Sequence, residues 1–323
     1  MSKAQSARPV RRPEYWLILG SLAFVAVCFY GIRAAAVMGL ASVTAMVTDF
    51  ICLFLRGRSY KLVDLSNVGH ALVLALMYPA TIPYSIVILS TMFGTVIGAH
   101  IFGYRRDLLF PPSAVGYLFA VCCWKNEVLQ FPEIGKRLAL FGNQVAMSDS
   151  LSAQFNEKGS IQYLHTELLE ALIGAVPGSM GTSCIIMLVL GIVILIIRRQ
   201  LKPFALFGFS LCIFLPVMAG NAGISILLTN MLLFSAIYFI GDSSLLPCSG
   251  VFAYLAAACT GLLTGYLITA FHLEYAPLVA VILTCPLWRW FAGLEVKYRK
   301  KFAAELELTE EEEALVNEVT GRV

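Results

Sequence analysis

Ten apolar windows, most of them near the length of a membrane crossing, constrain this sequence more than any other feature. A helix needs about 20 residues to cross a hydrocarbon core of about 30 Å. Of the 323 residues, 59% are hydrophobic and only 13% are charged, whereas about a quarter of the residues in a water-soluble chain are charged. The sequence therefore predicts an all-α, polytopic membrane helical bundle with about ten transmembrane helices and one long extracytoplasmic loop. The windows lie at about residues 15–31, 34–55, 66–80, 83–103, 111–124, 183–197, 203–219, 222–241, 249–270 and 276–292.

The third and fifth windows are short and are bounded by proline. Pro79 and Pro83 lie at the end of the third window, and Pro111 and Pro112 open the fifth. Proline ends or kinks a helix because it lacks the backbone N–H, and broken membrane helices are tolerated where protein surrounds them. The sequence therefore predicts two tilted or broken helices packed inside the bundle.

The positive charges give the bundle an orientation. Lysine and arginine concentrate in the terminal segments and in the even-numbered connections, whereas the short odd-numbered connections contain only Arg33. Because cytoplasmic connections have the excess of these residues, both termini are predicted to be cytoplasmic. The net charge of +3, divided among short clusters, is unlike a nucleic-acid footprint. The basic residues that indicate this orientation are Lys3, Arg8, Arg11, Arg12, Arg56, Arg58, Lys61, Arg105, Arg106, Arg198, Arg199, Lys202, Lys297, Arg299, Lys300 and Lys301.

One long connection divides the chain into two halves. We predict a cytoplasmic N-terminal segment, a first membrane half of five spans, an extracytoplasmic loop, a second membrane half of five spans and a cytoplasmic charged tail. These lie at residues 1–14, 15–124, 125–182, 183–292 and 293–323. In the tail, Thr309 precedes four glutamates. Acidic residues stabilise the first turn of a helix, so a helix is predicted to begin near Thr309.

Ionisable residues in or beside the spans are the candidates for function. Charge in a hydrocarbon core is costly and often marks an ion path, so Asp49, Asp64 and Asp242 are candidate ion-path residues. A capping or snorkelling carboxylate is the alternative, and an N-cap is a sufficient account of Asp64. His70 and His100 both lie toward cytoplasmic ends of spans. Two facing imidazoles can ligate a haem, but hydrogen-bonded interior histidines are the commoner arrangement.

The motifs argue against several chemistries. The nine cysteines include no Cys-x-x-Cys pair and no grouping with histidine at metal-site spacing, so no metal site is predicted. The sequence has no glycine-rich nucleotide loop, no G-x-S-x-G and no H-E-x-x-H. An ATPase or a hydrolase is therefore not expected.

Two stretches of the chain resemble each other, LLFPPSAVGYL at residues 108–118 and LLPCSGVFAYL at residues 245–255. Weak internal symmetry of this kind is common in membrane transport folds. Chance similarity between two apolar stretches is the alternative explanation.

The motifs along the membrane portion resemble those of the RnfD and NqrB family of membrane subunits. The early part shows an acid, a Leu-Arg-Gly-Arg turn, an Asp-x-Ser motif and a Leu-Ala-Leu-x-x-Pro run, here at Asp49, 55–58, 64–66 and 74–79. Later blocks are similar to the family's F-N-P-A, P-G-S-x-G and T-D-P motifs, the last of them at Asp242. The resemblance implies structural roles for the motif residues Gly98, Phe110, Pro112, Gly178, Ser179 and Gly181.

The sequence departs from this family where flavin would be attached. Family members with covalent FMN link it to a threonine in Asp-x-x-Ser-Gly-Ala-Thr. In the best matching register, which starts at Asp149 and skips the glycine, Gln154 stands at the threonine position. Glutamine has no hydroxyl to esterify. The resemblance therefore implies FMN or riboflavin as a family cofactor, but not covalent FMN. In the earlier block, a lysine, two glycines and two asparagines of the family are replaced by Ala99, Tyr104, Arg106, Leu108 and Pro111.

As a family expectation, the chain is a subunit of an ion-translocating electron transport complex of the Rnf type, in the bacterial inner membrane. Such a complex passes electrons between ferredoxin and NAD while an ion crosses the membrane. The resemblance implies that this subunit contributes to the ion path and to a flavin relay, and is not a stand-alone enzyme. Other subunits would supply iron–sulfur centres and flavin. A small-solute or ion transporter of related fold without redox activity is the alternative, and a scaffold subunit without turnover is a third interpretation.

Overall fold

The computed structural model describes residues 13–57, 66–104, 107–132, 138–140, 147–150, 172–174, 177–219, 231–242 and 245–320. These residues are mostly helical, with two short two-stranded antiparallel sheets, β1 with β2 and β3 with β4. The first half contains α1 (Pro13–Tyr30), α2 (Ile32–Leu55), α3 (Ser66–Met77), α4 (Tyr84–Gly94), the π-helix η3 (Thr95–Ile101), β1 (Gly103–Tyr104), β2 (Asp107–Leu108) and α5 (Pro112–Cys123). The rest contains α6 (Lys125–Leu129), β3 (Gln130–Pro132), β4 (Met147–Asp149), α9 (Ile185–Ile197), α10 (Pro203–Ala219), α11 (Leu232–Ser235), the π-helix η6 (Ala236–Ile240), α12 (Gly250–Phe271) and α13 (Ala276–Thr320).

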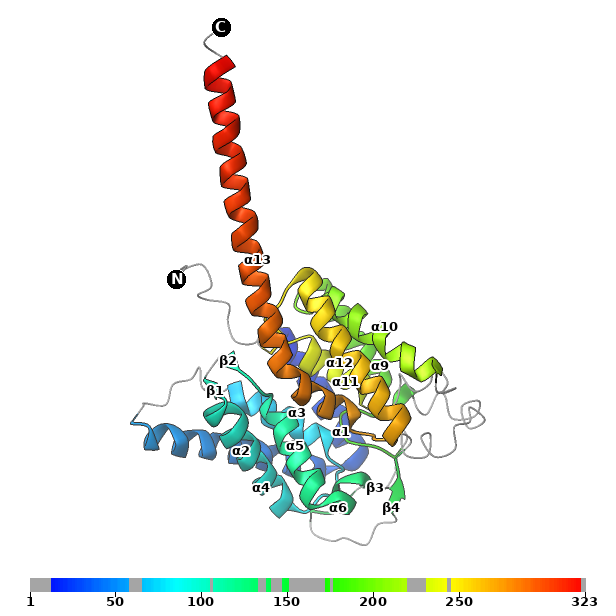
Figure 1. Ribbon diagram of the computed structural model, residues 1–323. Coiled ribbons are helices and arrows are strands. Elements are labelled where there is room, and N and C mark those ends of the chain that lie inside the picture. The colour runs from blue at the N-terminus through cyan, green and yellow to red at the C-terminus, as the bar shows by residue number, and fades with distance from the viewer. Residues whose placement is uncertain are drawn as a thin grey trace.

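Every predicted apolar window contains a helix of the structure, which confirms a mostly helical membrane architecture (Figure 1). Within the described residues, four helical stretches are long and apolar enough to cross a membrane: Ile32–Leu55, Tyr84–Ile101, Gly250–Phe271 and Ala276–Phe302. The other apolar helices are shorter. The number of about ten crossings therefore stays a prediction.

The two helices expected to be broken are short and lie inside the bundle. Helices α3 and α5 have 12 residues each, about 18 Å at a rise of about 1.5 Å per residue. Most of their described side chains are buried, and the rings of Tyr78 and Tyr117 stack with centroids 5.6 Å apart. The prolines set these limits, because α3 ends before Pro79 and α5 begins at Pro112.

Helix α2 has one face buried in the bundle and an opposite apolar face that is exposed. Its inner face buries mainly apolar side chains, several of them alanines, whereas Val43, Val47, Phe50 and Phe54 are all more than half exposed. These four lie on one helical face. A helix that is apolar on its outer face as well as its inner one is typical of a membrane span.

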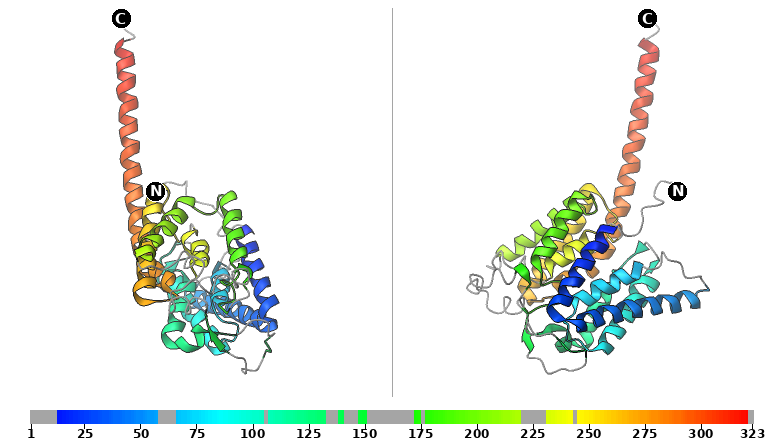
Figure 2. Two further views of the ribbon diagram at one scale, coloured as in Figure 1. Left: turned by 90° about the vertical axis from the view of Figure 1, so that its right-hand side faces the viewer. Right: turned by 180° about the vertical axis from the view of Figure 1, so that it is seen from behind.

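In the second half, α12 packs against both α10 and α13 (Figure 2). Polar side chains bind α12 to α13 in a buried row: Trp288 Nε1 donates to Thr260 Oγ1 at 3.0 Å, and the hydroxyls of Thr260 and Thr284 are 2.8 Å apart. Such hydrogen bonds between helices stabilise membrane bundles in which lipid and side chains are equally apolar.

Helix α13 is one continuous helix of 45 residues that projects out of the bundle (Figures 1 and 2). It passes through Thr309 without a break, so the prediction of a separate helix beginning there was wrong. The residues after the apolar part are mostly alanine, leucine, glutamate and lysine, which favour helix. The helix therefore continues where the hydrophobic signal ends.

The two internally similar stretches have the same local structure. In the first half, α4 passes into the π-helix η3, which ends at Ile101, and the next helix is α5, which begins at Pro112. In the second half, α11 passes into the π-helix η6, which ends at Ile240, and the next helix is α12, which begins at Gly250. Residues 108–118 and 245–255 each cover the end of the break and the start of the next helix. We call these two places the first break (residues 102–111) and the second break (residues 241–249).

Three of the family-motif residues lie together at the first break. A Cβ atom on Gly98 would lie 2.7 Å from the Cα atom of Pro112, so η3 and α5 approach more closely than a larger residue would permit. The rings of Phe102 and Phe110 meet edge to face with centroids 5.4 Å apart. Gly98 and Pro112 therefore allow a close approach of η3 to α5, and the family role of Gly98, Phe110 and Pro112 stays a prediction.

We expect Gly98→Ala to lower the free energy of unfolding by about 1–3 kcal/mol, because the added methyl meets backbone that cannot yield without moving α5. Thermal unfolding of the purified chain in detergent measures this. Gly39→Ala on α2 is the matched control, because nothing lies within 4 Å of its added methyl. The control should leave stability unchanged or raise it by up to about 1 kcal/mol. Equal losses in the two variants would contradict the close approach at Gly98.

Candidate functional site

Asp49 is the most deeply buried of the candidate ion-path residues that the structure describes. Its side chain lies on α2 and is 1% exposed. Its Oδ1 atom accepts a hydrogen bond of 2.7 Å from Asn67 Nδ2 on α3 and lies 2.7 Å from His100 Nε2 on η3. We call these three residues the Asp49 cluster. Its Oδ2 atom is also buried and has no hydrogen-bond partner among the described residues.

His100 occupies the end of the π-helix η3, and its backbone is held in place. The guanidinium of Arg56, just beyond the end of α2, donates to the His100 carbonyl oxygen at 2.5 Å. The hydrogen bond to Asp49 confirms the expectation that this histidine is a hydrogen-bonded interior residue. His70 lies on α3, one turn beyond Asn67, and is buried. Asp64 lies outside the described residues, so its capping role stays a prediction.

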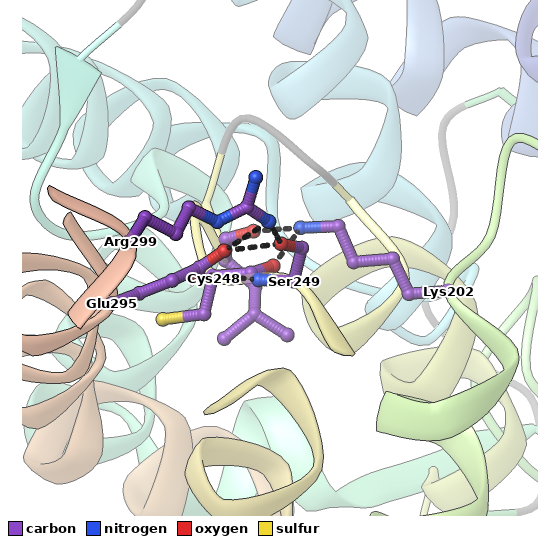
Figure 3. Close-up of polar contacts among 6 residues, drawn as sticks. Lys202, Cys248, Ser249, Glu295 and Arg299 are labelled. Carbon is purple, nitrogen blue, oxygen red and sulfur yellow. Dashed lines mark hydrogen bonds and ion pairs between the residues drawn. The ribbon is translucent and has the colours of Figure 1, made fainter. Parts of the chain in front are cut away.

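The second break holds another polar cluster, shown in Figure 3. Lys202, just ahead of α10, directs its ammonium toward the break and donates to the carbonyl oxygens of Leu246 and Cys248, both at 2.5 Å. Partial burial lowers the pKa of Lys202, while the nearby groups Cys248, Glu295 and Asp242 act in the opposite direction. The ammonium supplies donors to carbonyls that the break leaves without helical partners.

Helix α13 supplies the acid that caps α12. Glu295 Oε2 accepts the backbone N–H of Ser249 at 2.8 Å, and Oε1 accepts the Ser249 hydroxyl. Arg299, one turn further along α13, donates to Glu295 Oε1 at 2.7 Å and to Ser249 Oγ at 2.6 Å (Figure 3). A carboxylate at the N-terminus of a helix is stabilised by the unpaired N–H groups there. We call Lys202, Ser249, Glu295 and Arg299 the Lys202 cluster.

Asp242 belongs to the neighbourhood of the Lys202 cluster. Its backbone carbonyl accepts the N–H groups of Leu245 and Leu246, and its carboxylate acts electrostatically on Lys202. The structure therefore places Asp49 and Asp242 beside different partners, at the two breaks. Sequence reasoning missed Glu295 and gave Lys202 only a topological role. Two sequence features could have indicated these residues. Glu295 is an acid just after the last apolar window, and Lys202 directly precedes Pro203.

The P-G-S motif forms a turn that docks on the end of α3. The backbone N–H of Gly181 donates to the Leu76 carbonyl at 2.7 Å, and a Cβ atom on Gly181 would lie 2.6 Å from the Cβ atom of Leu76. The Gly178 carbonyl accepts the hydroxyl of Tyr30 at 3.3 Å. Ser179 and Thr182 pair their hydroxyls across the turn. Gly178, Ser179 and Gly181 therefore join the end of the long connection to the first half.

The attachment position expected for covalent FMN is not part of the described structure, so its loss stays a prediction. Gln154 itself lies outside the described residues. Ser150, four positions ahead of it in the sequence, donates its hydroxyl to Glu274 at 2.5 Å. Thr182, a threonine of the same connection, is occupied with Ser179. In the described residues, no group of three or more His, Cys, Asp or Glu side chains could hold a metal ion.

Apolar membrane-length helices around a buried carboxylate define a multi-pass helical membrane protein. The chain belongs to the NQR2, RnfD, RnfE family, whose sequence model matches residues 5–287. This finding confirms the resemblance seen in the motifs.

Named relatives match a shorter part of the chain, and each is the D subunit of an ion-translocating oxidoreductase complex. The chain is 29% identical over 117 residues to the protein of Actinobacillus succinogenes, which covers 35% of this chain and 33% of that protein. The protein of Shewanella denitrificans is 33% identical over 116 residues, covering 35% of this chain and 33% of that protein. That of Aeromonas hydrophila is 34% identical over 92 residues, covering 28% and 26%. The matched part spans a third or less of each of these relatives.

We expect Lys202→Met to destabilise the second break. The apolar replacement leaves the carbonyl oxygens of Leu246 and Cys248 without their donor, at about 1–3 kcal/mol for each buried group. Thermal unfolding in detergent measures the loss, and Lys300→Met, on the exposed surface of α13, is the control of equal charge. An unchanged unfolding temperature for Lys202→Met would show that its ammonium is not needed there.

Proposed function

We propose that this chain is the D-type membrane component of an ion-translocating electron transport complex in the bacterial inner membrane. The family match over most of the chain supports this, and the relatives named above are the D subunits of such complexes. The reaction would be a ferredoxin:NAD oxidoreduction that drives an ion across the membrane. This chain would contribute the ion path, and its partners would be the iron–sulfur and flavin subunits.

The single observation that supports an ion path best is the buried carboxylate of Asp49. An ionisable group 1% exposed within a membrane-length helix is costly unless it serves function or is fully paired. In this structure only one of its two oxygens has partners among the described residues. We place Asp242 and Asp64 on the same path as further candidates, Asp242 because it lies beside the other break.

We further propose ten crossings, with both termini in the cytoplasm and residues 125–182 outside. The short buried helices α3 and α5 would then be interrupted crossings surrounded by longer helices. If flavin takes part, we propose that it is FMN or riboflavin held without a covalent bond, because Gln154 replaces the attachment threonine.

The topology can be tested with a reporter that is active only outside the cytoplasmic membrane. Fused after Asn156, it should be active, because the long connection is proposed to be extracytoplasmic. The control fusion after Lys301, in the proposed cytoplasmic tail, should be inactive. The reverse pattern would invert the whole bundle.

The complex itself is tested by purifying the chain from its native membrane under mild conditions. Flavoprotein and iron–sulfur subunits should copurify, with flavin absorbance in the native preparation. On a denaturing gel, the band of this chain should show no flavin fluorescence. Fluorescence that persists in this band would contradict the proposed non-covalent flavin.

The second candidate function is a transporter for a small solute or ion without redox activity. The repeated π-helix, break and helix arrangement supports it, because broken helices in corresponding places of two halves are typical of transporters. A chain that purifies without other subunits and moves solute in liposomes would favour this function over the first.

A further inference from the structure

We propose that the ligand of the Asp49 cluster is a proton and that the cluster does not bind sodium. This inference rests on the proposed function, in which Asp49 belongs to an ion path, and adds the identity of the ion. It is argued from the three side chains that the structure brings together from α2, α3 and η3.

The short contact between Asp49 and His100 requires a proton. Oδ1 of Asp49 and Nε2 of His100 are 2.7 Å apart, a hydrogen-bond distance. A deprotonated imidazole nitrogen and a carboxylate oxygen are both acceptors, so one proton must lie between them. Either the imidazole N–H donates to the carboxylate, or the carboxylic O–H donates to the imidazole.

The same oxygen is unsuited to sodium. Asn67 directs an amide N–H to Oδ1 at 2.7 Å, so two nitrogen-bearing side chains already meet this atom. Hard cations take several oxygen ligands from carboxylates, carbonyls and water. Donor hydrogens and an imidazole ring on Oδ1 do not form such a set.

The second oxygen of Asp49 also favours protonation. Oδ2 is buried and accepts no hydrogen bond from any residue that the structure describes. Leaving a charged oxygen in this state is costly, and a buried carboxyl group reduces the cost by taking up a proton. Protonation of Asp49 removes the charge without requiring any further ligand.

His100 is placed to pass the proton between the surface and Asp49. Its side chain is 11% exposed, whereas that of Asp49 is 1% exposed. In the proposed step, a proton from the exposed side forms an N–H bond at Nδ1 of the imidazole, the Nε2–H bond breaks, and an O–H bond forms on Asp49 Oδ1. Histidine is suited to this because its charge changes near neutral pH. The π-helix places it, in keeping with the frequent occurrence of π-helical turns at functional sites.

The other charged and titratable groups near the cluster are few among the described residues. Cys52 and Arg56 lie further along α2, and Arg56 donates to the His100 backbone. His70 lies one turn beyond Asn67 on α3.

Infrared spectroscopy of the purified full-length chain tests the proposal directly. The C=O band of a protonated carboxyl group, identified by its shift in D2O, is followed across about pH 5–8, where histidine titrates, in sodium chloride and again in choline chloride. We expect one such band to be lost in Asp49→Asn and retained in Asp49→Glu. Its titration midpoint should be the same in both salts and should move in His100→Gln. Glu127→Gln, at an exposed position of α6, should leave the band unchanged.

Two results would overturn the proposal. A midpoint that falls when sodium replaces choline would show that sodium competes for the carboxylate. A spectrum in which Asp49→Asn removes no protonated carboxyl band would show that Asp49 stays ionised. Neither result depends on partner subunits, so a failure here is distinct from a failure of the copurification that tests the proposed function.

Discussion

A helix that ends inside a bundle leaves backbone groups without partners, and water is not present to replace them. Both breaks in this chain meet that constraint with charged side chains from other elements. At the second break, Lys202 donates to two carbonyls and Glu295 accepts the N–H of Ser249. At the first break, Arg289 of α13 donates to the Leu108 carbonyl at 3.0 Å. One helix, α13, thus supports both breaks.

The two breaks have related backbones but different chemistry. A π-helix precedes each of them, and a new helix follows each of them. Beside the first break lies an acid whose carboxylate meets an imidazole at 2.7 Å. At the second break an ammonium is held by two carbonyls and surrounded by acids. The two halves therefore share a backbone arrangement, and the polar side chains beside each break differ between them.

Much of this architecture could be predicted from the sequence, because hydrophobic windows and prolines act locally. Pro79 and Pro111 gave the limits of α3 and α5 without knowledge of their neighbours. The pairing of Asp49 with His100, 51 positions apart, could not be predicted, because it depends on how α2 and η3 pack. Lys202 counted as a topology signal, since burial of its ammonium depends on α12. The end of α13 was missed because hydropathy stops where helix propensity continues.

Helix α13 also has a mechanical consequence. Its 45 residues give a rod of about 68 Å at a rise of about 1.5 Å per residue, more than twice the thickness of a hydrocarbon core of about 30 Å. One part of this rod is bonded to both halves through Arg289 and Glu295, and the remainder extends beyond the bundle (Figure 2). Any force applied to the outer end acts with a long lever arm on two contacts. These are the hydrogen bond of Arg289 to the Leu108 carbonyl and that of Glu295 to the Ser249 N–H.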